Sequence, residues 1–135
     1  MIKQLEHIGV AVENVDEALK LFEGTIGLKL GKVMEVESEK VKIAFLSTGN
    51  TTIELLEPTS EESAIASFLE KRGEGIHHIC FEVEDIEEAL EAMRKKGIKL
   101  IYDKPRVRED GAKISFLHPK STHRVMIEFI EEPKA

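Results

Sequence analysis

Residues 7–22 read HIGVAVENVDEALKLF, and residues 78–93 read HICFEVEDIEEALEAM. The two segments lie 71 positions apart and share seven of 16 residues. Three further pairs of segments keep nearly the same spacing: Gly27–Leu30 with Gly97–Leu100, Lys42–Leu46 with Lys113–Leu117, and Ile53-Glu54 with Ile127-Glu128. Because chance similarity rarely stays in register over four segments, the chain consists of two copies of one module.

Each copy shows the same order of periodic patterns. Residues 7–12 alternate between apolar and other side chains, which predicts a strand with one apolar face. Residues 15–22 carry apolar side chains at helical spacing, and Gly27 is a plausible helix stop. After this helix, the first copy is predicted to contain further strands at 28–36, 41–47 and 51–57. The second copy is predicted to contain strands near 76–84, 98–103, 112–117 and 124–131, and a helix near 86–96.

The segment between the copies is predicted to form one more helix. Thr59 and Glu62 fit a capping box, Ser60 is a further N-cap candidate, and Gly73 and Gly75 close the segment. The fold class is thus α+β, with two tandem βαβββ modules. We expect a single domain over residues 1–135, with module 1 at about 1–57, the linker helix at about 58–75 and module 2 at about 76–131.

Composition limits the range of functions. Hydrophobic residues make up 41% and charged residues 33% of the chain, and the net charge is -7. That charge argues against nucleic-acid binding, and no apolar run is long enough to span a membrane. The single cysteine, Cys80, cannot form an intramolecular disulfide, and the N-terminus lacks the pattern of a signal peptide. We therefore expect a cytoplasmic protein.

Four residues with metal-binding side chains occupy equivalent positions in the two copies. His7 and His78 begin the first strand of each module, and Glu54 and Glu128 lie inside the last strand. By strand parity both histidines point away from the apolar face. A carboxylate in an apolar strand is costly to bury without compensation. Two imidazoles and two carboxylates suit a divalent cation such as Co, Mn, Ni, Fe or Zn.

A simpler interpretation stays open at this point. A single histidine or glutamate in a strand is more often structural or exposed, and a duplicated fold with a solvated strand face produces the same residues. His77 should point away from His78 and is interpreted as structural or as a support to the site. His118 and His123 are expected on the surface. Cys80 shares the face of His78, and a buried inert thiol is expected.

The chain resembles the vicinal-oxygen-chelate superfamily, whose fold consists of paired βαβββ modules. Within it, several segments resemble the methylmalonyl-CoA epimerases. They are LEHIGVAV at residues 5–12, GEGIHHI at 73–79, FLHPKS at 116–121 and the stretch from Ile53 to Ser63. The first segment is shared across the superfamily, whereas the double-histidine and His-Pro-Lys segments are more specific to the epimerases.

The resemblance implies interconversion of (R)- and (S)-methylmalonyl-CoA in propionate metabolism, through a metal-stabilised enolate. It implies that His7, Glu54, His78 and Glu128 bind the metal. Co²⁺ is the favoured ion, and Mn²⁺, Ni²⁺ and Zn²⁺ are alternatives. It also implies a homodimer and a catalytic base at Glu128. The second base of some relatives aligns near Ile43, which cannot transfer a proton. Glu39 is the candidate here, and Glu37, a water or another pocket residue are alternatives.

The basic stretch from residue 104 to residue 124 is a candidate for contacts with the CoA phosphates. Its cations are Lys104, Arg106, Arg108, Lys113, Lys120 and Arg124.

Two other functions fit the same fold. A glyoxalase I-type lactoylglutathione lyase would use nearly the same four ligands. A metal-free small-molecule binding protein would lack the ligands, whereas all four positions are occupied here.

Overall fold

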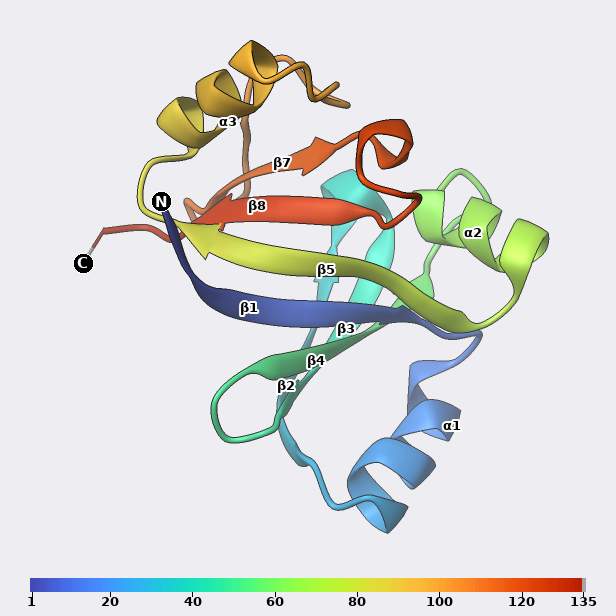
Figure 1. Cartoon of the computed structure of the whole chain (residues 1–135). Coiled ribbons are helices and arrows are strands. Elements are labelled where there is room, and N and C mark those ends of the chain that lie inside the picture. Colours follow the sequence, from blue (N-terminus) through green and yellow to red (C-terminus); the bar gives the residue numbers. More distant parts are fainter. Residues whose placement is uncertain (135) are drawn as a thin grey trace. The chain divides into compact units, whose positions relative to one another are not determined.

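The computed structural model describes residues 1–134 and divides into two compact units (Figure 1). Unit 1 contains residues 1–6 and the chain from His78 onward, and unit 2 contains His7–His77. Strand β1 (Ile2–Ala11) begins in unit 1 and ends in unit 2, whereas β5 (Gly75–Val83) begins in unit 2 and ends in unit 1. The N-terminal residues therefore belong to the unit of the second repeat. That the chain forms one domain stays a prediction.

Unit 2 is built on a four-stranded sheet with the order β2-β3-β4-β1. Its strands are β2 (Lys29–Val36), β3 (Val41–Ser47), β4 (Thr52–Pro58) and the second half of β1. β4 is antiparallel to β3 and parallel to β1, and the hairpin between β2 and β3 contains a 3₁₀ turn at Glu37–Glu39. β2, β3 and β4 match the predicted ranges to within one residue. β1 starts at Ile2, so the prediction that His7 begins this strand is wrong.

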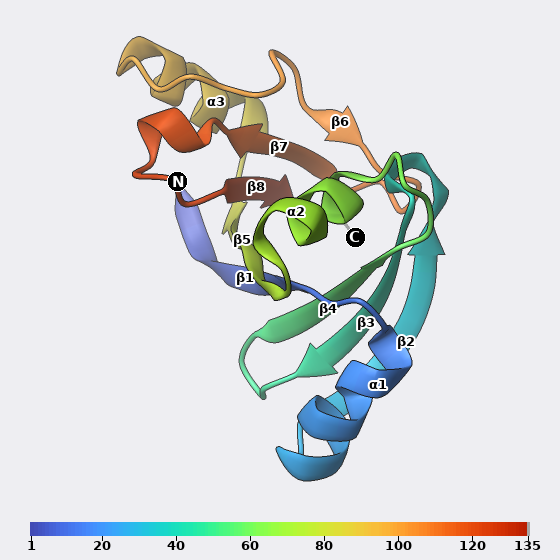
Figure 2. The same cartoon turned by 90° about the vertical axis from the view of Figure 1, so that its right-hand side faces the viewer.

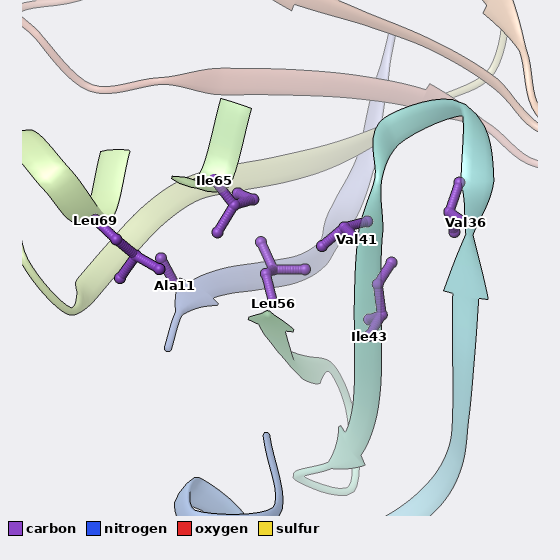
Figure 3. Close-up of a cluster of buried hydrophobic side chains, with 7 residues drawn as sticks. All are labelled: Ala11, Val36, Val41, Ile43, Leu56, Ile65 and Leu69. Carbon is purple, nitrogen blue, oxygen red and sulfur yellow. The ribbon is translucent and has the colours of Figure 1, made fainter. Parts of the chain in front are cut away.

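The two faces of this sheet have different cover (Figures 2 and 3). Helix α1 (Val15–Leu19) and the π-helical segment Lys20–Thr25 pack on one face. That cluster buries Val12, Val15, Ala44, Leu46 and Leu55. Helix α2 (Ala64–Arg72) packs on a second cluster, formed by Ala11, Val36, Val41, Ile43, Leu56, Ile65 and Leu69. The expectation that a helix covers the Ile8/Val10/Val12 face is confirmed.

Unit 1 repeats this plan with the strand order β5-β8-β7-β6. Its remaining elements are helix α3 (Ile86–Lys95) and strands β6 (Arg106–Val107), β7 (Lys113–Leu117) and β8 (Ile127–Glu131). α3 places Ile86, Ala89 and Leu90 on one stripe that buries against the sheet, together with Phe129. The other face carries a smaller apolar cluster of Cys80, Ala112, Ile114 and Ile130.

Both modules start their helix in the same way. Asn14 and Asp85 are the N-caps of α1 and α3, and each side chain accepts from the N–H three residues on. In addition, Glu57 accepts from Val15 N–H at 2.7 Å, and Glu131 accepts from Ile86 N–H at 2.9 Å. A carboxylate at the end of the last strand thus satisfies the first orphan N–H of the helix, where the helix dipole favours negative charge.

Two predicted elements differ from the structure. The strand at 98–103 is reduced to a single bridge between Leu100 and Leu117, and pairing resumes only at β6. Pro105 lies between the bridge and β6, and its missing N–H cannot contribute to a ladder at that position. The capping box at Thr59 is also wrong. Ser63 is the N-cap of α2, and its hydroxyl accepts from Ile65 N–H at 3.1 Å.

Two other predicted ranges are shorter than expected. α1 ends at Leu19 and continues as the π-helical segment. β8 starts at Ile127 because His123 and Arg124 have positive φ angles of 56° and 68°, which a strand does not accommodate.

None of the described helices combines the length and apolar character needed to cross a membrane.

Candidate functional site

Unit 2 holds a buried histidine–carboxylate pair. His7 Nδ1 lies 3.1 Å from Glu54 Oε2, and the two residues are 1% and 5% exposed. The register of the parallel strands places Gly9 directly opposite Glu54. Because glycine has no side chain, Gly9 places no side-chain atom beside this carboxylate.

Unit 1 holds the equivalent pair. His78 Nε2 lies 3.1 Å from Glu128 Oε1, and the residues are 7% and 4% exposed. Here Cys80 is directly opposite Glu128, as Gly9 is opposite Glu54. In both units, therefore, the histidine lies two positions before the strand residue that is directly opposite the glutamate. In the structure each histidine is paired with the glutamate of its own repeat.

The chemistry of each pair suits a cation. A buried carboxylate is unstable without compensation by a positive charge or several hydrogen bonds. An imidazole nitrogen together with a carboxylate oxygen is a donor set for Co, Mn, Ni, Fe or Zn. Each unit thus offers half of the predicted four-residue set, and the residues present fit a divalent metal.

An aromatic ring stands next to each of these glutamates. Phe45 pairs directly with Glu54 across β3 and β4, and Phe116 pairs directly with Glu128 across β7 and β8. The His78 and Phe116 rings meet edge to face at a centroid distance of 6.1 Å. The ring gives each carboxylate one apolar neighbour, which strengthens its electrostatic interactions.

The predicted second base lies apart from the pair of its own unit. Glu39 is in the 3₁₀ turn before β3, and Glu54 faces Phe45, four residues beyond the start of that strand. At about 3.3 Å per residue, Glu39 is more than about 13 Å along the sheet from Glu54. Its catalytic role stays a prediction.

The other singled-out residues have structural environments. His77 packs edge to face on Phe68 of α2 with ring centroids 5.0 Å apart, in agreement with the structural interpretation. Cys80 is fully buried in the apolar cluster of unit 1. His123 is exposed, and His118 Nδ1 accepts from Lys120 N–H at 3.1 Å.

The predicted basic stretch contains one ordered aromatic contact. The Arg106 guanidinium lies 3.7 Å from the Tyr102 ring centroid, and Tyr102 meets Phe116 edge to face at 6.0 Å. Arg108 instead pairs with Asp110 at 2.7 Å, and this guanidinium holds the pKa of the Asp110 carboxyl below its usual range.

The sequence analysis did not predict three features that lie around the two histidine–glutamate pairs or at the helix starts. They are the phenylalanine beside each glutamate, the Tyr102–Arg106 contact, and the carboxylates of Glu57 and Glu131 at the helix starts. The first and the third carried a usable signal, because Phe45/Phe116 and Glu57/Glu131 are repeat-equivalent in the sequence.

The fold and the donor sets agree with the family comparison. A family model of the glyoxalase/bleomycin resistance protein/dioxygenase superfamily matches residues 6–116, so the chain belongs to this superfamily. An ethylmalonyl-CoA/methylmalonyl-CoA epimerase of Cereibacter sphaeroides is 37% identical over 130 residues, which cover 95% of this chain and 97% of the relative. Within the superfamily the chain belongs with the methylmalonyl-CoA epimerases.

Solved structures give the same result. A hypothetical protein from Bacillus halodurans matches with a TM-score of 0.94 and 45% identity, covering 98% of this chain and 96% of that one. A Streptomyces coelicolor methylmalonyl-CoA epimerase variant in complex with 2-nitronate-propionyl-CoA matches with a TM-score of 0.90 and 34% identity, covering 99% and 100%. The α+β fold of paired βαβββ modules is confirmed.

Lactoylglutathione lyases are more distant relatives. One from Arabidopsis thaliana is 23% identical over 111 residues, which cover 82% of this chain and 38% of that protein. The glyoxalase alternative is therefore the weaker of the two enzymatic interpretations.

Proposed function

We propose that this protein is an epimerase that interconverts (R)- and (S)-methylmalonyl-CoA. The observation that carries the proposal is the repeat-equivalent pair of buried histidine and glutamate in each unit, in a chain 37% identical to a curated epimerase over nearly its full length. The nitronate bound by the Streptomyces coelicolor relative adds support, because a planar nitronate resembles the enolate that forms when C2 loses its proton.

We propose His7, Glu54, His78 and Glu128 as the ligands of one divalent cation, with Co²⁺ favoured over Mn²⁺, Ni²⁺ and Zn²⁺. The support is the donor type and burial of each pair. When bound, such an ion supplies Lewis-acid stabilisation of negative charge on the substrate oxygens. The carboxylates of the pairs are acceptor-only groups when ionised, so they also suit proton removal.

Inversion at C2 requires a proton-transfer group on each side of the substrate. Glu128 is the proposed group on one side. Glu39 is the predicted group on the other, and Glu54 is a further buried carboxylate that unit 2 offers. An enzyme that has lost one of the two groups would still exchange the C2 proton of one epimer with solvent, while inversion to the other epimer would be lost.

Further parts of the proposal concern partners and location. The anionic CoA moiety would meet the basic stretch around Arg106, which the contact with Tyr102 orders. We also propose a homodimer in the cytoplasm, in line with the family resemblance and the single buried thiol. A sedimentation measurement on the purified protein tests the dimer.

The central experiment follows C2–H exchange. Metal-stripped and Co²⁺-loaded protein are incubated in deuterated water with one epimer, and NMR follows the C2 proton while an epimer-specific enzyme detects the product. Exchange and inversion that both need the metal are expected. Absence of exchange with every divalent cation would overturn the proposal, and turnover of a glutathione hemithioacetal would favour the lyase instead.

The same assay separates the candidates for the second base. Glu39→Gln and Glu54→Gln are compared with each epimer as the starting material. One-sided exchange in the Glu39→Gln variant would support Glu39, whereas full inversion in that variant together with one-sided exchange in Glu54→Gln would assign the role to Glu54.

A further inference from the structure

Strand β2, at the edge of the unit 2 sheet, changes register once. Leu30 pairs with Leu46 but Lys32 pairs with Phe45, so Gly31 is an extra residue on β2. In an uninterrupted ladder Lys32 would face Ala44, whose side chain packs in the cluster under α1. Because successive residues of a strand point to opposite faces, the bulge turns Lys32 onto the other face of the sheet.

That other face is the one that carries His7 and Glu54. The register places Gly9, Glu54, Phe45 and Lys32 in one row across β1, β4, β3 and β2. Lys32 Nζ lies 4.9 Å from the Phe45 ring centroid, a cation–π contact that holds the ammonium over the ring. Two inter-strand spacings put the Lys32 backbone about 10 Å from that of Glu54. The flexible Lys32 side chain spans part of this separation, so its ammonium reaches a molecule bound next to Glu54, which itself is paired with His7.

The same order of groups recurs in unit 1 with different residues. Phe116 stands beside Glu128, Tyr102 packs on Phe116, and the Arg106 guanidinium lies over Tyr102. One module arrives at this order through a bulge and a lysine, and the other through a tyrosine and an arginine. A duplicated backbone alone does not require a cation at either position.

We propose that Lys32 is a specificity-determining residue that binds an anionic group of the substrate. The proposal rests on the proposed function, because a malonyl-type CoA thioester carries two kinds of anion, the acyl carboxylate and the CoA phosphates. A lysine ammonium binds either one as a compact point charge. It also offsets part of the negative charge that Glu54 and the substrate bring to the same face.

The test compares Lys32→Met and Lys32→Arg with Lys20→Met. Lys20 is a matched control, because it loses the same charge but lies beyond α1 on the other face of the sheet and pairs with Glu17 at 3.0 Å. Calorimetry measures the Kd of 2-nitronate-propionyl-CoA, and steady-state kinetics measure kcat and KM for methylmalonyl-CoA. Thermal melts establish that each variant is folded.

Lys32→Met is expected to raise both Kd and KM about tenfold, the effect of losing one charge-assisted hydrogen bond, while kcat stays within about twofold. Lys32→Arg should restore binding to within about threefold of the wild type, and Lys20→Met should leave it unchanged. High salt should shrink the difference between Lys32→Met and the wild type.

A truncated substrate distinguishes the two anions. Methylmalonyl-pantetheine keeps the acyl carboxylate and lacks the nucleotide phosphates. A Lys32→Met defect that persists with this substrate assigns Lys32 to the carboxylate, and a defect seen only with the CoA thioester assigns it to a phosphate. Unchanged Kd and KM in Lys32→Met, in an active enzyme, overturns the inference alone. Ligand binding that depends on Lys32 in a protein without epimerase activity overturns only the proposed function.

Discussion

Glu54 and Glu128 are charged residues in the middle of apolar strands, and each is paired with a histidine of its own unit at 3.1 Å. Breaking a buried ion pair by removing one partner typically costs about 3–5 kcal/mol, because a buried charge is left without compensation. Burying these charged groups is energetically unfavourable, so a purely structural role does not account for them well. A bound cation would compensate the two carboxylates.

Loss of a proposed ligand should remove metal and activity together. We expect His7→Ala and Glu128→Ala each to lower turnover more than about 100-fold, beyond the effect typical of residues that merely support a ligand. Elemental analysis should find the metal content lowered in parallel. His123→Ala is the control, because it removes an exposed imidazole. Full activity of either ligand variant after thorough chelation would refute the metal mechanism.

Ser115 offers a stability test at the residue scale. Its hydroxyl is fully buried without a hydrogen-bond partner, and the equivalent residue of the other module is the fully buried Ala44. An unsatisfied buried hydroxyl is unfavourable by about 1–3 kcal/mol. Ser115→Ala should therefore raise the free energy of unfolding by about 1 kcal/mol, measured by urea denaturation. The reverse change, Ala44→Ser, should lower it, and a destabilised Ser115→Ala would mean that the hydroxyl has a partner.

At the scale of elements, the start of each helix depends on the last strand of its own module. Glu57 on β4 binds the first N–H of α1, and Glu131 on β8 binds that of α3. α1 is only five residues long and α3 ten. Helices of this length are marginal in isolation, so tertiary contacts of this kind contribute to their stability.

Removing one of these carboxylates should destabilise the fold measurably. Glu131→Ala is expected to lower the free energy of unfolding by about 1 kcal/mol, the usual cost of losing a helix N-terminal partner. Chemical denaturation provides the measurement, and Glu61→Ala, in an exposed turn, is the comparison. Equal stability of both variants would show that water replaces the carboxylate at no cost.

At the scale of the whole molecule, acidic residues outnumber basic ones, and in unit 1 this excess affects the pKa of one carboxyl group. Burial raises the pKa of the Glu132 carboxyl, and the nearby charge of Glu6 and, more weakly, that of Glu82 raise it further, while Arg108 opposes the shift. A carboxyl with a raised pKa binds more protons in the folded than in the unfolded state. Stability therefore falls as pH rises from its ordinary pKa through the higher folded value.

The direction of this pKa shift predicts that removing the Glu132 charge stabilises the protein in a pH-dependent way. Glu132→Gln should raise the Tm at neutral pH, because the neutral amide avoids the unfavourable burial of a carboxylate beside Glu6. The gain should disappear at pH values below the ordinary pKa of glutamate, because the wild-type group is then neutral as well. A series of thermal melts between pH 3 and pH 8 measures both limits. A gain that is independent of pH would point to packing instead of charge.

The outline of the fold follows from local signals in the chain. Apolar periodicity and the repeat identify the βαβββ order, and His7, His78, Glu54 and Glu128 are recognisable because duplication places them at equivalent positions. Parity within a strand also gives the correct face for both histidines, since the alternation of side chains is a property of the strand itself. The pairing of each histidine with the glutamate of its own repeat is an observation of the structure.

Cross-strand register could be known only from the tertiary structure. The bulge at Gly31, the phenylalanine beside each glutamate and the carboxylate at each helix start all depend on which residues of separate strands face each other. The loss of pairing before β6 and the N-cap at Ser63 likewise reflect competition among several local signals. A shift of one residue in register reverses the face of every side chain that follows. The local pattern of β2 therefore leaves the face of Lys32 open, and its pairing with β3 decides it.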